Sequence, residues 1–184
     1  MQKMEELQLT RQCRAGDQRA WRMLYDRYAG RMLAVALRYL GDRARGEDLM
    51  QEAFIRIFNR FDRFEWQGEG SLWGWIKQIT IRLAIDQLRQ EGRLETLRID
   101  EERLELFNTE VDMEQLQAFS TDELLELIAR MPDGYRTILN LYCIDGFSHR
   151  QIAEQLHILE KSSSSRLSRA RALLAKRMRE HKTR

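Results

Sequence analysis

A single proline, Pro132, interrupts 184 residues in which apolar side chains recur at intervals of three and four along most of the chain. This spacing places the apolar side chains on one face of an α-helix. A proline inside a helix removes a backbone hydrogen bond and bends or ends the helix, so a chain with one proline has few forced stops. The pattern therefore predicts an all-α protein.

Three long amphipathic helices are expected in the first half of the sequence. The first runs from Asp17, whose side chain suits a helix N-cap, to Gly41, and the second begins near Ala44. The third begins at Ser71 and frays near Gly92. Their expected core side chains include Leu24, Tyr28 and Met32, then Met50, Phe54, Ile57 and Phe61 with Phe58 beside them, and finally Leu72, Trp75, Ile76, Ile79 and Leu83.

A second group of helices is expected after residue 119. Ser120 and Glu123 have the spacing of a capping box, and the helix that they begin ends at Met131, directly before the proline. A further helix is expected over about residues 135–142. Short helices in close succession indicate a second, separate core.

The C-terminal third of the sequence has helix-turn-helix spacing. Ser148 and Gln151 form another capping-box pattern, and the short helix that follows buries Ile152 and Leu156. A three-residue turn then leads to a second helix that begins near Glu160. Two helices joined in this way are typical of DNA-binding proteins, in which the second helix enters the major groove.

The second helix of this pair contains four consecutive serines followed by arginines. Leu167, Ala170 and Leu174 are expected in the core. The exposed face is then expected to present Ser162, Ser165, Arg166 and Arg169. Arginine donates to phosphates and to guanine, and the small serine side chain allows close approach to base edges. A solvated basic helix after a flexible serine patch is the alternative interpretation.

Basic residues gather at the C-terminal end, although the formal net charge is only +2. They predominate from Lys161 onward, whereas acidic residues predominate over residues 95–126. A basic end beside an acidic middle fits a nucleic-acid binder. We expect two small helical domains, over residues 1–92 and 120–184, joined by a flexible acidic linker over residues 93–119.

Catalytic and metal-binding patterns are absent from the sequence. Cys13, Cys143, His149 and His157 lack the spacing of metal ligands, so buried thiols and surface histidines are expected. We find no nucleophile–base pair, P-loop or metal-carboxylate motif, which argues against an enzyme, a cofactor and a small-molecule substrate. With neither a signal segment nor a membrane-length apolar run, a reduced, cytoplasmic compartment is expected.

Five segments, taken in order, resemble the bacterial extracytoplasmic-function (ECF, group 4) sigma factors of the sigma-70 family. They are CRAGDQRAWRMLYDRY, GEDLMQEAFIRIF, SLWGWIKQITIRLAIDQLR, MPDGYRTILNLYCIDGFSHRQIAEQL and SRLSRARALL. The resemblance extends over about residues 7–178, apart from the linker. It implies an alternative sigma factor that binds core RNA polymerase and directs transcription initiation at promoters.

The resemblance also implies partners and the residues that meet them. Core polymerase would be bound through the clamp of its largest subunit and the flap of its second, with Asp48, Gln51 and Glu52 on the clamp. Without the resemblance, these acids would be interpreted as residues that favour the positive end of a helix dipole. An anti-sigma factor is implied as well, which would hold the protein inactive in the cytoplasm or at the inner membrane.

Promoter DNA is the third partner that the resemblance implies. In this family the segment matching residues 64–70 captures a flipped non-template base of the −10 element, and aromatic side chains beside glycines suit an unstacked base. The candidate −10 residues are Phe64, Trp66, Gln67, Arg82 and Arg89. The candidate −35 residues are Ser162, Ser164, Ser165, Arg166 and Arg169.

The sequence departs from the family pattern at two places. Arg82 stands where the family usually has an asparagine that positions DNA near the −10 element. In the helix-turn-helix, His157, Leu159 and Lys161 replace a turn that is commonly rich in glycine, and Ser164 stands where a basic residue is often found. Histidine adopts a left-handed backbone less readily than glycine.

Two other classes of protein remain as alternatives. A stand-alone helix-turn-helix regulator would bind duplex DNA tightly without polymerase, usually as a dimer on a palindrome. A protein that only mediates interactions would use the acidic middle as its docking surface and show no promoter preference. The EDLMQE helix together with the aromatic and glycine-rich loop favours the sigma factor.

Overall fold

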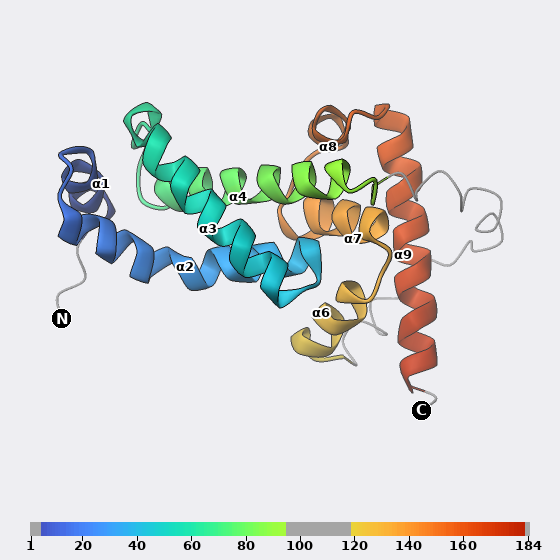
Figure 1. Ribbon diagram of the computed structural model, residues 1–184. Helices are drawn as coiled ribbons and strands as arrows, with labels where there is room; N and C mark the ends of the chain where they lie inside the picture. The colour runs from blue at the N-terminus through green and yellow to red at the C-terminus, as the bar shows by residue number, and fades with distance from the viewer. Residues whose placement is uncertain (1–4, 95–118, 183–184) are drawn as a thin grey trace. The chain divides into compact units, whose positions relative to one another are not determined.

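The computed structural model describes residues 5–94 and 119–182, in which all regular secondary structure is helical (Figure 1). The protein is therefore all-α, as the sequence predicts. It divides into two compact units, Met1–Ala84 and Ile85–Arg184, and the boundary falls within one helix. The predicted acidic linker lies almost entirely outside the described residues.

The first unit contains α1 (Glu6–Arg14), α2 (Gln18–Leu40), α3 (Arg43–Arg60), the short 3₁₀ turn η1 (Phe61–Arg63) and the first part of α4 (Ser71–Gln90). The Asp17 carboxylate accepts hydrogen bonds from the backbone of Arg19 and Ala20 at the start of α2. Gly41 ends the same helix in a left-handed conformation, with φ +68°. Both ends of α2 are where the local sequence signals place them.

Helices α2 and α3 pack antiparallel along their length. Trp21 meets Phe58 and Tyr25 meets Phe54, each pair with ring centroids 4.8 Å apart. At the other end, Gly46 lies so close to α2 that a Cβ there would be 3.2 Å from the side chain of Leu37. The absence of a side chain at this position allows the two helices to approach closely.

The expectation that Phe58 lies beside the buried face of α3 is wrong. This side chain is 61% exposed, whereas Phe61 is buried, as predicted. The reason is that α3 ends at Arg60 and the chain tightens into η1, which turns Phe61 inward and leaves Phe58 packed on Trp21 by one face only. Helical periodicity does not show where a helix stops.

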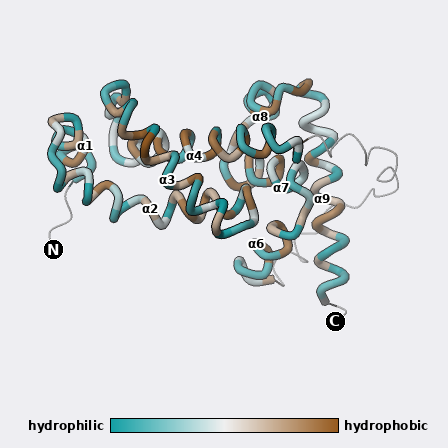
Figure 2. The backbone as a smooth tube through the Cα atoms, viewed as in Figure 1, coloured by the Kyte–Doolittle hydropathy of each residue, from teal (hydrophilic) through white to brown (hydrophobic). Residues whose placement is uncertain are grey.

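Helix α4 is buried on more sides than its periodicity suggests. Leu72, Ile76 and Leu83 are buried as predicted, while Trp75 and Ile79 are only partly buried. Further buried apolar side chains are Ile81, Ala84, Ile85 and Leu88. Figure 2 shows hydrophobic residues recurring along the whole of this helix.

The second unit contains α6 (Thr121–Ala129), α7 (Asp133–Leu139), the π-helical turn η3 (Asn140–Ile144), α8 (His149–Leu156) and α9 (Glu160–Lys182). Both predicted capping boxes are confirmed, at the starts of α6 and α8. In the first, the backbone and hydroxyl hydrogen bonds of Ser120 lower the pKa of Glu123. Helix α9 packs against α6, α7 and α8, so it organises the core of this unit.

The predicted helix over residues 135–142 begins earlier and changes its winding. It starts at Asp133, directly after Pro132, and its last turns widen into η3. Proline fixes its own φ near the helical value, which suits the start of a helix. The wider turn ends at Ile144, and Gly146 then reverses the chain with φ +75°.

A turn of left-handed backbone separates α8 from α9. His157 ends α8 with φ 53° and ψ 48°, and the chain enters α9 at Glu160. Ile152, Ala153 and Leu156 are buried, which confirms the predicted inner face of α8. The helix-turn-helix of the sequence pattern is therefore present, with histidine in the position that glycine would occupy most easily.

Candidate protein and nucleic-acid interfaces

One face of α3 presents Asp48, Gln51 and Glu52 to solvent. The opposite face is buried and consists of Gly46, Leu49, Met50, Ala53 and Ile57. Glu52 accepts a hydrogen bond from Arg56 at 2.6 Å, with both side chains about half exposed. An exposed ion pair of this kind is weak, about 0.2–1 kcal/mol, so a partner can displace it.

Two large apolar side chains continue this exposed face of α3. Ile55 and Phe58 lie one and two turns beyond Glu52, and each is 61% exposed. Neither residue was expected on this surface from the sequence, because helical spacing alone does not separate a buried aromatic residue from an exposed one. Acidic, amide and apolar groups together form a surface suited to a protein partner. We call residues 48, 51, 52, 55 and 58 the α3 face.

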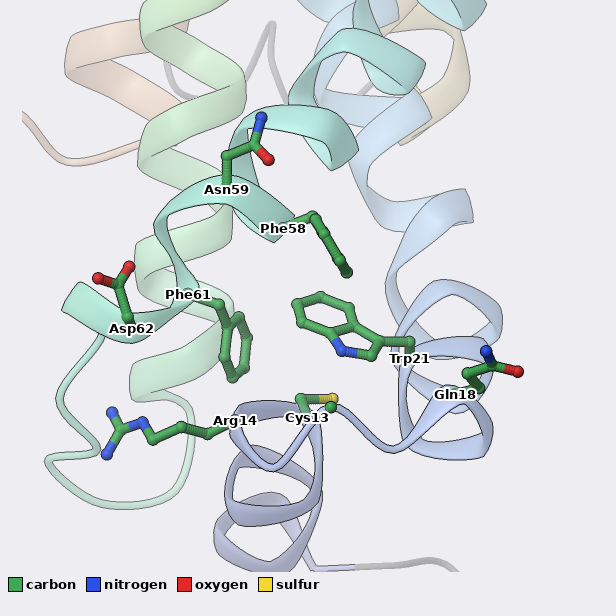
Figure 3. Close-up of a pocket in the computed structure, with 9 residues that line it drawn as sticks. Cys13, Arg14, Gln18, Trp21, Phe58, Asn59, Phe61 and Asp62 are labelled. Carbon is green, nitrogen blue, oxygen red and sulfur yellow. The ribbon is translucent and has the colours of Figure 1, made fainter.

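A hollow of about 640 Å³ lies beside this surface, between α1, the start of α2 and the end of α3. In Figure 3, Trp21 lies between Phe58 and Phe61, with Cys13 below the indole ring. The centroid of the indole ring is 4.8 Å from that of each phenyl ring. The hollow leaves one side of this aromatic cluster open.

The loop over residues 64–70 divides its aromatic side chains between core and surface. Phe64 is only 3% exposed and packs against Trp75 and Phe61, with centroid distances of 5.2 and 6.0 Å. Trp66 is 37% exposed, and Gln67 is also exposed. Of the two aromatic −10 candidates in this loop, Phe64 therefore has its ring packed beside Trp75, and only Trp66 presents an exposed ring.

Glycines and a serine shape the end of this loop. Gly68 and Gly70 have φ values of +119° and +88°, which side chains other than hydrogen rarely allow. The Ser71 hydroxyl donates to the Gly68 carbonyl at 2.6 Å and accepts from the Gln67 backbone N–H at 3.1 Å. The loop therefore has a specific folded form in which Trp66 and Gln67 face outward.

The remaining −10 candidates lie on α4. Arg82 is exposed, whereas Arg89 is partly buried and donates to the Asp86 carboxylate at 2.9 Å. Nearer the start of α4, Trp73 stacks parallel to Tyr28, and the Arg31 guanidinium lies 3.9 Å above its ring centroid. Trp73 therefore supports the aromatic packing of the first unit, and Arg31 lies over one face of its ring.

The exposed face of α9 in the structure differs from the predicted one by a rotation about the helix axis. Only Ser165 of the four predicted side chains is exposed, while Ser162, Arg166 and Arg169 are partly buried. Leu167, Ala170 and Leu174 are buried as predicted, and Ser163 is buried with them. The outward stripe of the first turns is Lys161, Ser164, Ser165, Ser168 and Arg171. Ser163 shifts the buried stripe because it has a partner on α8.

That partner is His149. Its Nδ1 lies 3.1 Å from the Ser163 hydroxyl, and Tyr142 stacks on the imidazole with centroids 4.6 Å apart. The Arg171 guanidinium lies 5.7 Å from the Tyr142 ring centroid. The serine run is therefore helical, and one of its members joins α9 to α8.

The two cysteines have different environments. Cys13 is buried, and burial together with the nearby Asp17 carboxylate raises its pKa to about 12. Cys143 is exposed, so the expectation of two buried thiols is wrong for this residue. Among residues 5–94 and 119–182, no cluster of three or more His, Cys, Asp or Glu side chains has the arrangement of a metal site.

Within the same residues, no helix has both the length and the apolar character that crossing a membrane requires.

Two family models match the chain. Sigma-70 region 2 matches residues 24–94, and sigma-70 region 4 matches residues 121–174. The first match includes α3, the loop and α4, and the second includes the helix-turn-helix. The matched segments thus contain every candidate site residue.

Curated relatives have the same order of segments. The ECF RNA polymerase sigma factor SigE of Mycolicibacterium smegmatis is 29% identical, and the alignment covers 90% of this chain and 65% of that protein. The ECF RNA polymerase sigma factor SigW of Bacillus subtilis is 29% identical, with 92% and 95% covered. The chain thus spans about two thirds of the first relative and nearly all of the second.

A solved structure has a similar fold. The sigma factor RpoE of Bartonella quintana, in complex with the anti-sigma factor NepR, aligns with a TM-score of 0.52 and 20% sequence identity. The alignment covers 86% of this chain and 96% of that chain. At this identity the likeness concerns the fold.

Proposed function

Because the chain belongs to the ECF group of the sigma-70 family, we propose that it is an alternative sigma factor, which binds core RNA polymerase and directs it to promoters with particular −10 and −35 elements. The single observation that supports this most directly is the combination of a region 2 and a region 4 segment in one chain. A stand-alone regulator needs only the helix-turn-helix.

The α3 face is the proposed contact with the clamp of the largest polymerase subunit. Its exposed carboxylates and amide can accept charge-assisted hydrogen bonds from arginines of the partner. Ile55 and Phe58 then add apolar area at the same surface, since each exposes more than half of its side chain. Apolar side chains bordered by polar ones are typical of protein interfaces.

The loop over residues 64–70 is the proposed site for an unstacked −10 base. Trp66 offers an exposed ring for stacking, and Gln67 offers both a donor and an acceptor for a base edge. The buried ring of Phe64 supports the loop from below. Arg82 and Arg89, farther along α4, are proposed contacts to the DNA backbone.

Helix α9 is the proposed −35 recognition helix. Its first turns present Ser164 and Ser165 outward, between the exposed Lys161 and Arg171. Ser162, Arg166 and Arg169 border this stripe and complete the proposed set. Hydroxyls and guanidinium groups in the major groove contact base edges, and the cations contact phosphates.

The proposed domains follow the boundaries expected from the sequence, 1–92 and 120–184, with the acidic linker between them. As a subunit of RNA polymerase the protein would act in the cytoplasm, without catalytic activity of its own. RpoE of Bartonella quintana was solved with an anti-sigma factor, and we propose a partner of this class here, which could also hold the protein at the inner membrane.

The test is co-purification with core RNA polymerase, followed by transcription from a pool of promoter fragments. Wild-type protein should co-purify and yield promoter-dependent transcripts, whereas Asp48→Arg should lose both, because it places a cation where arginines of the clamp are expected to bind. Asp26→Arg is the matched control, since Asp26 is an exposed acid of α2 outside the α3 face.

The opposite result identifies the alternative. Tight duplex binding without polymerase, together with no co-purification, would indicate a stand-alone regulator. Equal loss of polymerase binding in Asp26→Arg and Asp48→Arg would contradict the assignment of the α3 face.

A further inference from the structure

Helix α1 holds both ends of the loop over residues 64–70. Glu6, in its first turn, accepts hydrogen bonds at the end of the loop, and Arg14, in its last turn, donates to the Phe64 carbonyl at the beginning. The two lie eight positions apart, which is about 12 Å of helix. Both residues precede the segment that matches sigma-70 region 2, which begins at residue 24.

Glu6 completes the N-terminus of α4 from a distant part of the sequence. Its Oε2 accepts from the Gly70 backbone N–H at 3.2 Å, and its Oε1 accepts from the Leu72 backbone N–H at 3.0 Å. The first backbone N–H groups of a helix have no partner within it, and a side chain at the N-cap usually provides one. Gly70, directly before α4, has no side chain for this purpose.

The Glu6 carboxylate is almost completely removed from water. Glu6 is 4% exposed, and its Oε2 also accepts from the Tyr28 hydroxyl at 3.3 Å. A buried carboxylate is costly unless it is hydrogen-bonded, and the three donors here together with the positive end of the α4 dipole supply that compensation. The carboxylate therefore has a strongly preferred position, and so do the N–H groups that bind it.

We propose that α1 fixes the loop over residues 64–70 in its base-binding form, with Glu6 and Arg14 as positioning residues. The inference rests on the proposed function of that loop. Gly68 and Gly70 give the loop many alternative conformations when it is free, so fixing both ends lowers the entropy lost when a base is captured. Neither positioning residue needs to touch DNA.

The experiment uses full-length protein in complex with core RNA polymerase. The probe is a fluorescein-labelled single-stranded non-template −10 oligonucleotide taken from a promoter enriched in the transcription assay, with a scrambled oligonucleotide for comparison. The variants are Glu6→Gln and Arg14→Ala. Matched controls are Glu5→Gln, at the N-cap of α1, and Arg11→Ala, within the helix, whose parent side chains are both exposed.

We expect Glu6→Gln and Arg14→Ala to weaken −10 binding about tenfold, which corresponds to ~1.4 kcal/mol, and to reduce discrimination against the scrambled oligonucleotide. Binding of a −35 duplex should stay within twofold of wild type, as should polymerase binding. Both controls should behave as wild type. Amide hydrogen exchange of Gly70 and Leu72 should become faster in Glu6→Gln.

Three results would overturn the proposal. One is wild-type −10 discrimination in both variants. The second is an equal loss of −10, −35 and polymerase binding, which would indicate general destabilisation; Arg14→Ala is informative here because Arg14 is exposed. The third is a wild-type holoenzyme that does not distinguish the −10 oligonucleotide from its scrambled form. This result would contradict the proposed function of the loop, and with it the role proposed for α1.

Discussion

At the scale of single residues, Leu159 is the least expected side chain of the helix-turn-helix. It precedes α9, its carbonyl accepts the first helical hydrogen bond from Ser163, and its side chain is 76% exposed. Leucine at this N-cap position cannot accept a hydrogen bond from the helix N-terminus, whereas serine can.

Leu159→Ser should therefore raise the free energy of unfolding of the second unit by about 1 kcal/mol. Urea denaturation followed by circular dichroism measures this change. Leu159→Ala is the control, because it removes the same apolar side chain without adding a cap. Equal stability of the two variants would show that a serine at position 159 does not cap α9.

Cys13 and Tyr28 make the first unit sensitive to alkaline pH. Burial raises the pKa of Cys13 from 9.0 to about 12, and burial with the neighbouring Glu6 carboxylate raises that of Tyr28 from 10.0 to about 12. Above pH 9 the unfolded chain therefore releases protons that the folded chain retains, and stability falls as pH rises toward 12.

The urea midpoint of the first unit should thus decline between pH 9 and 12. Cys13→Ala should delay the start of that decline toward pH 10, where Tyr28 begins to contribute. An unchanged pH profile in this variant would contradict a role for Cys13.

The roles of helix-capping residues were predictable from the sequence where the cap lies next to the helix that it caps. Asp17, Ser120 and Ser148 cap helices that begin at the next residue, so a spacing of two or three positions is sufficient to identify them. Glu6 caps a helix that begins 65 positions later, and no local pattern indicates such a contact. Its burial is a consequence of tertiary structure alone.

At the scale of elements, Arg136 joins α6 to α7. It is 4% exposed, donates to the carbonyls of Ala129 and Met131 at 2.8 and 3.2 Å, and pairs with the Asp133 carboxylate. The carbonyls at the C-terminal end of a helix lack partners within it, so this guanidinium closes the end of α6.

Arg136→Met should destabilise the second unit by about 1–3 kcal/mol, because the buried carbonyls of Ala129 and Met131 lose their donor, while Asp133 keeps Arg93 as a second ion-pair partner. Arg130→Met is the matched control. Arg130 forms an exposed pair with Glu126 at 3.5 Å, and its loss should change stability by less than about 1 kcal/mol. Thermal unfolding of both variants tests the difference, and similar losses would contradict the role of burial.

The presence of each helix was predictable from the hydrophobic periodicity, but which side chains face outward was not always predictable. In α9 the spacing of Leu167, Ala170 and Leu174 correctly identifies the inner face, yet buried Ser163 rotates the outward stripe away from Arg166 and Arg169. Hydrophobic periodicity cannot identify a buried polar residue such as Ser163, because its burial depends on a partner in another helix, here His149.

At the scale of the whole molecule, the protein consists of two units, each of which offers a small surface for DNA. The first 94 residues contain the proposed −10 loop, and α9 contains the proposed −35 side chains. A formal net charge of only +2 gives little non-specific attraction to DNA. Joint binding of both elements is therefore needed for tight promoter recognition.

Free protein should bind a −35 duplex weakly, and holoenzyme should bind a fragment containing both elements at least a hundredfold more tightly, within the 10²–10⁴ gain typical of linked sites. Fluorescence anisotropy of labelled fragments measures both affinities at one fixed salt concentration. Tight binding of the −35 duplex by free protein would contradict the need for joint binding of both elements. Two-site organisation was predictable from motif order, because each motif forms within its own short segment.

The unequal exposure of the two cysteines has a practical consequence for following this protein in solution. Cys143 is exposed at the end of η3, with its sulfur 3.9 Å from Arg171 of α9, whereas Cys13 is buried. A maleimide dye should therefore attach to one position in the native protein and to two after denaturation, as intact mass spectrometry would show. The natural sequence thus provides a fluorescent reporter beside α9 without mutagenesis.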